Sequence, residues 1–257
     1  MKNNILVLLC ISILSFSCKK STEKSSKTET KSEETTKKSN LEIYPISHAT
    51  AVLTSAENVI YIDPTGGAEA FVNYDKPTLV FITDIHGDHL DIKTLEALDL
   101  SSAIIVAPKA VAEKISSLTV KEIIVMNNGD EKTLSNIKAE AIPMYNLREE
   151  ALNFHPKGRG NGYLLTINDE RIYFSGDTED IPEMRSLKNI DKAFICMNLP
   201  YTMTVESAAS AVLDFKPKQV YPYHYRGTDG MSDVAKFKTL VTEGNSGIEV
   251  VQLNWYQ

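Results

Sequence analysis

Short runs of residues that favour β-structure start near Leu41 and predict a series of short strands. Turn-forming residues separate these runs, as in the stretch Asp63-Pro64-Thr65-Gly66-Gly67. The strands expected in this first part of the chain cover residues 41–47, 50–54, 58–63 and 79–82. Their short connections are typical of a meander, in which neighbouring strands run antiparallel.

From residue 91 onward, segments with the helical spacing of apolar residues alternate with further strands. The expected helices cover residues 91–99, 108–117, 204–214 and 232–242. The expected strands cover residues 103–106, 122–126, 137–142, 162–167, 171–174, 193–197, 219–223 and 248–253. Thr204 is a suitable N-cap for the third helix, and Glu206 lies in its first turn. Because crossovers start only after the early strands, two sheets covered by helices explain this order better than one parallel sheet.

The first forty residues differ in character from the rest of the chain. An apolar stretch after Lys2 is too short to span a bilayer comfortably and predicts a signal peptide over residues 1–17. The pair Ser17-Cys18 resembles a bacterial lipobox, which implies acylation of Cys18 and export to the cell envelope as a periplasmic or outer-membrane lipoprotein. Ordinary cleavage near Ser17, releasing a soluble protein, is the alternative.

Residues 18–40 are almost free of apolar side chains, so we predict a disordered tether there and a folded domain over residues 41–257. The tether contains seven Lys and four Glu, and without it and Lys2 the net charge changes from −7 to −11. A domain this acidic repels nucleic acid and anionic membrane surfaces. Membrane contact is therefore expected only through the anchor at Cys18.

Cysteines do not support the predicted fold through disulfides. Of the three cysteines, Cys10 lies in the predicted signal peptide and Cys18 is the predicted anchor. Cys196 remains, within the apolar run from Ala193 to Met197, and we expect it to be a buried thiol.

Imidazole and carboxylate groups occur where predicted strands end. Five side chains share this placement: His86, His89, His155, Asp177 and His224. Because such loops converge at one edge of a sheet, we expect these side chains to meet in one site. The spacing Asp84-x-His86-x-Asp88-His89 also allows one tight turn to serve two cations, which in two-metal enzymes lie about 3.5–4 Å apart. Imidazole and carboxylate ligands suit zinc, with iron, manganese or cobalt as alternatives.

These motifs resemble those of hydrolases with the metallo-β-lactamase fold. Residues 84–89 are similar to the His-x-His-x-Asp-His signature, Gly176-Asp177-Thr178 to the bridging Asp, and Pro222-Tyr223-His224-Tyr225 to the last His. Further segments resemble a branch of bacterial metal-dependent hydrolases similar to ascorbate-6-phosphate lactonase: Tyr145-Asn146, residues 154–158, 172–178 and 181–184, and Tyr201-Thr202-Met203. The resemblance covers roughly residues 41–257. It implies an α/β fold, a four-layer αββα sandwich of two mixed β-sheets flanked by helices.

The resemblance also implies a set of metal ligands. One cation would be bound by Asp84, His86 and His155, and a second by Asp88, His89 and His224, with Asp177 bridging them. Asp84 departs from the signature, which has His at this position. A carboxylate can still bind a cation, and this harder ligand favours manganese or iron over zinc at that position. We therefore expect two divalent cations, with zinc favoured and manganese or iron as alternatives.

Other residues near these motifs have two interpretations each. His48 lines the pocket or satisfies a buried hydrogen bond, and Asp63 orients a metal-bound imidazole or shapes a turn. Lys157, Arg159 and Arg226 bind an anionic group or are solvated loop charges. Four side chains are candidates for substrate contact or for simple packing: Tyr145, Asn146, Tyr201 and Tyr225.

The predicted activity is hydrolysis of a small ester, lactone or phosphodiester by a metal-activated water, with Asp88 passing a proton to the leaving group. No Gly-x-Ser-x-Gly motif is present, so the chain has no candidate serine nucleophile of that type. One alternative is an envelope lipoprotein that binds metal or a ligand without catalysis. A redox protein with iron at the site is another.

Overall fold

The computed structural model describes residues 41–256. The predicted signal peptide, the anchor at Cys18 and the tether lie outside these residues and stay predictions. Within the described part of the chain, no helix is long and apolar enough to cross a membrane.

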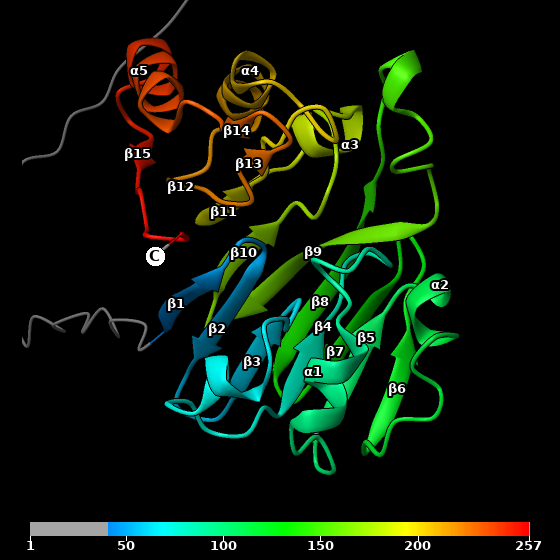
Figure 1. The fold of residues 1–257 in the computed structure, drawn as a ribbon. Helices are drawn as coiled ribbons and strands as arrows, with labels where there is room; N and C mark the ends of the chain where they lie inside the picture. The colour runs from blue at the N-terminus through cyan, green and yellow to red at the C-terminus, as the bar shows by residue number, and fades with distance from the viewer. Residues whose placement is uncertain (1–40, 257) are drawn as a thin grey trace, which may run out of the picture. The chain divides into compact units, whose positions relative to one another are not determined.

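The first half of the domain forms a six-stranded sheet (Figure 1). Its strands, in spatial as well as chain order, are β1 (Glu42–Ser47), β2 (Thr50–Thr54), β3 (Val59–Ile62), β4 (Leu79–Phe81), β5 (Ile104–Ala107) and β6 (Glu122–Val125). The first three run antiparallel, and from β3 onward neighbours are parallel. The predicted change from a meander to crossover connections is present, but it comes one strand earlier than expected. Strand β4 pairs parallel with β3, because residues 63–78 are long enough to form a crossover.

The second half forms a seven-stranded mixed sheet. Its order is β15 (Glu249–Val250), β12 (Gln219–Pro222), β11 (Lys192–Ile195), β10 (Glu170–Phe174), β9 (Gly160–Ile167), β8 (Ile137–Met144) and β7 (Glu131–Leu134). Strands β7 to β10 pair antiparallel, and β10, β11, β12 and β15 pair parallel. A separate hairpin joins β13 (Arg226–Gly227) to β14 (Gly230–Met231).

Alternating side chains of the first sheet belong to two different cores. On β4, Leu79 and Phe81 pack in the larger core with residues of the second sheet, whereas Val80 packs in a smaller core. Strand β5 repeats the pattern, with Val106 in the larger core and Ile105 in the smaller. Since successive side chains of a strand point to opposite faces, this sheet is covered on both sides.

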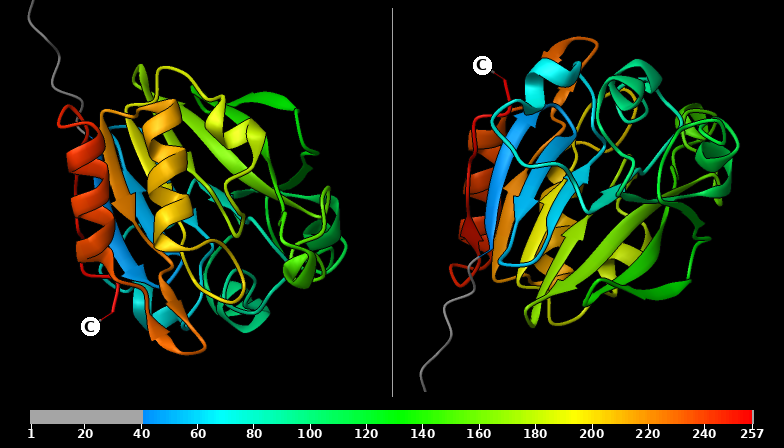
Figure 2. Two further views of the ribbon diagram at one scale, coloured as in Figure 1. Left: turned by 90° about the horizontal axis from the view of Figure 1, so that it is seen from above. Right: turned by 90° about the horizontal axis from the view of Figure 1, so that it is seen from below.

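Helices cover the outer faces of the two sheets (Figure 2). Short helices α1 (Ile92–Ala97) and α2 (Lys109–Ala112) and the 3-10 turn η1 (Ala68–Phe71) contribute to the smaller core. Helices α4 (Val205–Phe215) and α5 (Val234–Gly244) pack on the second sheet, near the short α3 (Pro182–Arg185). A second 3-10 turn, η2 (Glu149–Ala151), lies in the loop after β8. The predicted four-layer sandwich of two mixed sheets is confirmed.

The predicted cap of the third helix is also confirmed, because the Thr204 hydroxyl accepts a hydrogen bond from the Ser207 amide. Two predicted elements are longer than those observed. The helix expected over 108–117 ends at Ala112 and continues as turns, and the strand expected over 248–253 is confined to two residues. Strand β7 escaped prediction because its edge position exposes Glu131, Lys132 and Thr133, so no apolar alternation marks it.

Candidate metal centre

Loops at one edge of the two sheets bring together the polar side chains that follow their strands. The loop after β4 carries Asp84, His86, Asp88 and His89, the loop after β10 carries Asp177, and His224 follows β12. His155 lies between η2 and β9. The structure arranges these side chains in two neighbouring groups of possible metal ligands.

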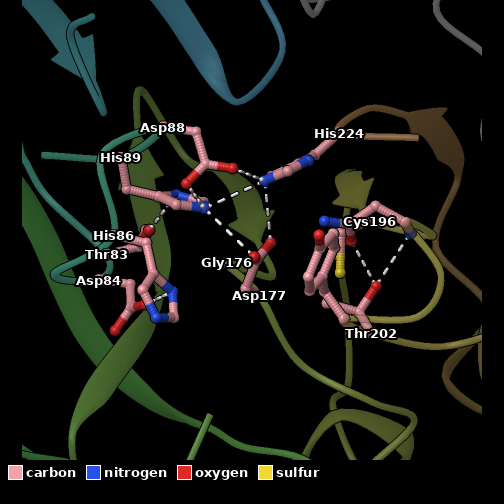
Figure 3. Close-up of polar contacts among 12 residues, drawn as sticks. Thr83, Asp84, His86, Asp88, His89, Gly176, Asp177, Cys196, Thr202 and His224 are labelled. Atoms are coloured by element: carbon pink, nitrogen blue, oxygen red, sulfur yellow. Dashed lines mark hydrogen bonds and ion pairs between the residues drawn. The ribbon is translucent and has the colours of Figure 1, made fainter. Parts of the chain in front are cut away.

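The first group consists of Asp88, His89, Asp177 and His224 (Figure 3). The Nε2 atom of His224 lies 3.1 Å from Nε2 of His89, 3.3 Å from Oδ2 of Asp88 and 3.2 Å from Oδ1 of Asp177. The Nε2 atom of His89 lies 3.4 Å from Oδ2 of Asp177. All of these atoms face a common point. Within the described residues, Asp177 Oδ1 is buried without a hydrogen-bond partner. Such converging donors fit a divalent cation.

Asp63 holds His89 in the orientation that this group requires. The fully buried Asp63 carboxylate accepts hydrogen bonds from the amide and hydroxyl of Thr83, and its Oδ2 lies 2.8 Å from Nδ1 of His89. Nδ1 is thereby occupied as a donor, and Nε2 faces the other ligands. Of the two interpretations of Asp63, the structure therefore favours the one in which its carboxylate orients the His89 imidazole.

The buried charges of this group shift each other's pKa values. Burial lowers the pKa of His89, but the carboxylates of Asp177 and Asp63 outweigh burial and raise it well above its usual value. Burial raises the pKa of Asp177, but the charges of His224 and His89 outweigh burial and lower it well below its usual range. Asp177 is therefore a carboxylate at neutral pH, and a cation binding to His89 displaces a proton.

The second group consists of Asp84, His86 and His155. Oδ2 of the buried Asp84 lies 2.7 Å from Nδ1 of His86 and 4.0 Å from Nε2 of His155. The Nδ1 atom of His155 faces the Tyr201 carbonyl oxygen at 3.2 Å, which directs Nε2 to within 3.2 Å of Asp177 Oδ2. Asp177 thus lies between the two groups.

Arg159 joins the second group, and its contact with Asp84 was not predicted. Its Nε and Nη2 atoms donate to the two oxygens of Asp84 at 3.2 and 3.1 Å. Nη2 also donates to the Phe154 carbonyl oxygen and lies 3.5 Å from Nε2 of His86. Burial raises the pKa of Asp84, but the hydrogen bond with His86 and the charges of His89, His86 and Arg159 bring it to about 2.

A cavity of about 240 Å³ opens beside both groups. Its lining consists of His86, Asp88, Phe154, His155, Asp177, Asn198 and Tyr201. Phe154 and Asn198 were missed from the sequence, although Phe154 precedes a predicted ligand and Asn198 follows the buried strand β11. Their positions next to a predicted ligand or a strand end were the sequence signal that could have identified them as site residues.

Of the four candidates for substrate contact, only Tyr201 lines this cavity. The Tyr145 hydroxyl donates to Glu183, and the Asn146 amide donates to the carbonyl oxygens of Ala151 and Tyr201. The ring of Tyr225 packs against that of Tyr256, with centroids 4.8 Å apart. None of these three side chains lines the cavity, although Asn146 supports it through the hydrogen bond to the Tyr201 carbonyl oxygen.

His48 lies against the first group from its other side. Its Nε2 atom is 3.3 Å from Asp88 Oδ2, and its ring lies 3.9 Å from that of His224 between centroids. Its Nδ1 atom lies 2.8 Å from the Tyr256 hydroxyl, near the end of the chain. His48 therefore fits the interpretation of a residue that makes a partly buried hydrogen bond, and it is not among the residues that line the cavity.

Two sheets flanked by helices, with a His/Asp metal-binding cluster at the strand ends, define a metal-dependent hydrolase of the metallo-β-lactamase fold. A family model described as the beta-lactamase superfamily domain matches residues 60–225, and the chain belongs to this superfamily. Among its relatives are UPF0173 metal-dependent hydrolases. One from Pyrococcus horikoshii is 30% identical over 207 residues, which are 76% of this chain and 90% of that protein. One from Thermococcus kodakarensis is 31% identical over 206 residues, with the same two shares.

Solved structures agree with this family. A crystal structure of a proposed metal-dependent hydrolase from Parabacteroides distasonis is 40% identical, with a TM-score of 0.75, and covers 84% of this chain and 94% of that one. A metallo hydrolase from Ignicoccus hospitalis has a TM-score of 0.70 over 84% of this chain and 96% of that one, and at 21% identity it shows the fold alone. Similarity to the ascorbate-6-phosphate lactonase branch stays a prediction.

Replacing Asp63 by asparagine is expected to weaken metal binding by about 10–100-fold, the usual effect of losing a group that orients a metal-bound imidazole. The amide of the variant can donate to Nδ1 of His89, and the imidazole would then carry its proton on Nε2, where the ligand lone pair is needed. Competition with a chromophoric chelator measures this Kd. Asp99→Asn, at an exposed carboxylate paired with Lys76, is the control. An unchanged Kd in folded Asp63→Asn would rule out the orienting role.

Proposed function

We propose that this protein hydrolyses a small ester, lactone or phosphodiester by means of a metal-activated water. The observation that carries this proposal is the convergence of two imidazole nitrogens and two carboxylates in the first group, with separations of 3.1–3.9 Å between neighbouring ligand atoms. A divalent cation bound there would lower the pKa of its water to about 7 and supply a nucleophile at neutral pH.

The residues of this chain would bind and orient the reactants around that cation. Asp177 and His224 are buried, and His89 is held by Asp63, so three of the four ligands are positioned before any substrate enters. The cavity of about 240 Å³ accommodates only a small group beside them. Phe154 and Tyr201 form an edge-to-face aromatic pair with centroids 5.1 Å apart, which offers an apolar wall to the substrate.

Asp88 is the group that we propose for proton transfer to the leaving group. Both carboxylates of the first group line the cavity, but the Asp88 side chain is 41% exposed, whereas that of Asp177 is only 4% exposed. A proton donor must reach the leaving atom directly or through one water, and Asp88 is the more accessible of the two carboxylates. Zinc is favoured by the mixed imidazole and carboxylate ligands, with manganese or iron as alternatives.

Removal of the metal is expected to abolish turnover, with a fall of at least about 10³-fold, since the cation contributes several kcal/mol of transition-state stabilisation. The experiment uses a panel of aryl lactones, p-nitrophenyl esters and bis-p-nitrophenyl phosphate. Hydrolysis is measured before chelation, after chelation and after addition of zinc, manganese or iron(II), with metal content followed by mass spectrometry. Activity that persists in demonstrably metal-free protein would refute the proposal. Metal binding without turnover on any substrate would favour the non-catalytic alternative.

A further inference from the structure

We propose that the Arg159 guanidinium takes the place of one of the two expected cations, so that the protein binds a single divalent cation at Asp88, His89, Asp177 and His224. This inference rests on the proposed metal site and concerns its stoichiometry and charge.

Distances between ligand atoms differ between the two groups. Ligands of a tetrahedral cation with bonds of about 2.0–2.1 Å lie about 3.3–3.4 Å from one another. In the first group, the Nε2 atom of His224 has neighbours at 3.1, 3.2 and 3.3 Å, close to this value. In the second group, Asp84 Oδ2 and His86 Nδ1 are 2.7 Å apart. That separation is shorter than the spacing of two ligands of one tetrahedral cation and is typical of a direct hydrogen bond between the two side chains.

Asp84 is already neutralised by a bidentate contact. Both of its oxygens accept hydrogen bonds from Arg159, at 3.2 and 3.1 Å, and the carboxylate is fully buried. Fork-to-fork pairs of this kind are among the stronger polar contacts in proteins, and the arginine stays charged at any working pH. The additional hydrogen bond from Nη2 to the Phe154 carbonyl oxygen holds the guanidinium in this position.

The charges of the two groups also favour a cation in the first group and none in the second. With neutral imidazoles, the two carboxylates of the first group carry two negative charges, which match a divalent cation. In the second group, Arg159 cancels the charge of Asp84 and leaves none to attract a cation. Arg159 Nη2 also lies only 3.5 Å from His86 Nε2, so a cation bound among Asp84, His86 and His155 would be close to a like charge.

The remaining parts of a second site are nevertheless present. His155 presents Nε2 at 3.2 Å from Asp177 Oδ2, and His86 lies beside it with ring centroids 5.1 Å apart. Asp84 would become available if the guanidinium were removed. The inference therefore predicts that removal of the Arg159 charge creates a second cation-binding site.

The test is the number of metal ions per chain, measured by mass spectrometry after the full-length protein is equilibrated with zinc or with manganese and freed of loosely bound metal. The native protein is expected to hold one ion. Arg159→Gln is expected to approach two, and Arg159→Lys, which keeps the charge, is expected to stay at one. Arg185→Gln is the matched control. Arg185 is likewise paired with carboxylates, here Asp180 and Asp214, which belong to neither group of ligands, and this variant is expected to stay at one ion.

The outcomes separate this inference from the proposed function. Two ions in the native protein, or one ion in a folded Arg159→Gln variant as judged by circular dichroism, would overturn the role of Arg159 and leave the hydrolase proposal intact. If Arg159→Gln does not fold, the inference is tested by the metal content of the native protein and of Arg159→Lys. Two ions per chain in either of them would contradict it. No ion in the native protein would overturn both proposals.

Discussion

Substitution of Asp177 by alanine is expected to remove bound metal and to reduce turnover by at least about 10³-fold, because the several kcal/mol contributed by the cation would be lost. Asp177 contacts residues of both groups. Its Oδ1 lies 3.2 Å from His224, and its Oδ2 lies 3.4 Å from His89 and 3.2 Å from His155, in each case to Nε2. Without Asp177, the imidazoles of His89, His155 and His224 remain, but the carboxylate that lies between them is lost, and with it one of the negative charges that would attract a cation.

Metal content and hydrolysis of the substrate panel are measured on the same preparation, and circular dichroism shows whether the domain is folded. Asp177→Asn keeps nearly the same shape but removes the negative charge and replaces one acceptor oxygen by an amide donor, so it tests the carboxylate without opening a cavity. Asp99→Ala removes an exposed carboxylate that is paired with Lys76, and it should retain both metal and turnover. Native turnover in a metal-free Asp177→Ala preparation would show that Asp177 is not part of the reaction site.

Substitution of Phe194 by alanine is expected to lower the free energy of unfolding by about 3–5 kcal/mol, the usual range for a buried phenylalanine. Phe194 is fully buried on β11, in the middle of the second sheet. Its ring stacks on Phe174 and Tyr221 with centroid distances of 4.3 and 4.6 Å, and it meets Trp255 edge-on. Removal of the ring leaves a cavity among aromatic side chains that β10, β12 and the C-terminal segment hold in place.

Chemical denaturation followed by fluorescence or circular dichroism measures this loss, provided that the transition is two-state. Val72→Ala, at a side chain that is 74% exposed, is the control and should change the free energy of unfolding by no more than about 0.5 kcal/mol. A denaturation midpoint for Phe194→Ala within the range of the control would mean that this aromatic cluster does not stabilise the domain as its packing suggests.

The sequence by itself determined most of the strands, the main helices and the side chains that gather at the strand ends. Short apolar runs mark β2, β3 and β4 because these strands are buried on both faces of the sheet, and Thr204 marks the start of α4 because a hydroxyl there satisfies a free backbone amide. The spacing within residues 84–89 placed imidazoles and carboxylates on one turn. These are local properties. They can be predicted from the spacing of apolar residues along the chain and from the residue types within a single loop.

Only the tertiary structure decided which of those side chains meet, and in what state. The residues of each contacting pair are far apart in the sequence. Asp63 and His89 are separated by 26 positions, Asp84 and Arg159 by 75, and His48 and Tyr256 by 208. Each contact depends on how strands of different sheets are registered and packed, and no periodic pattern along the chain encodes this. The pairing of Arg159 with Asp84 shows the consequence most clearly. In the sequence Asp84 is one more possible metal ligand, whereas in the fold its charge is already balanced by a guanidinium.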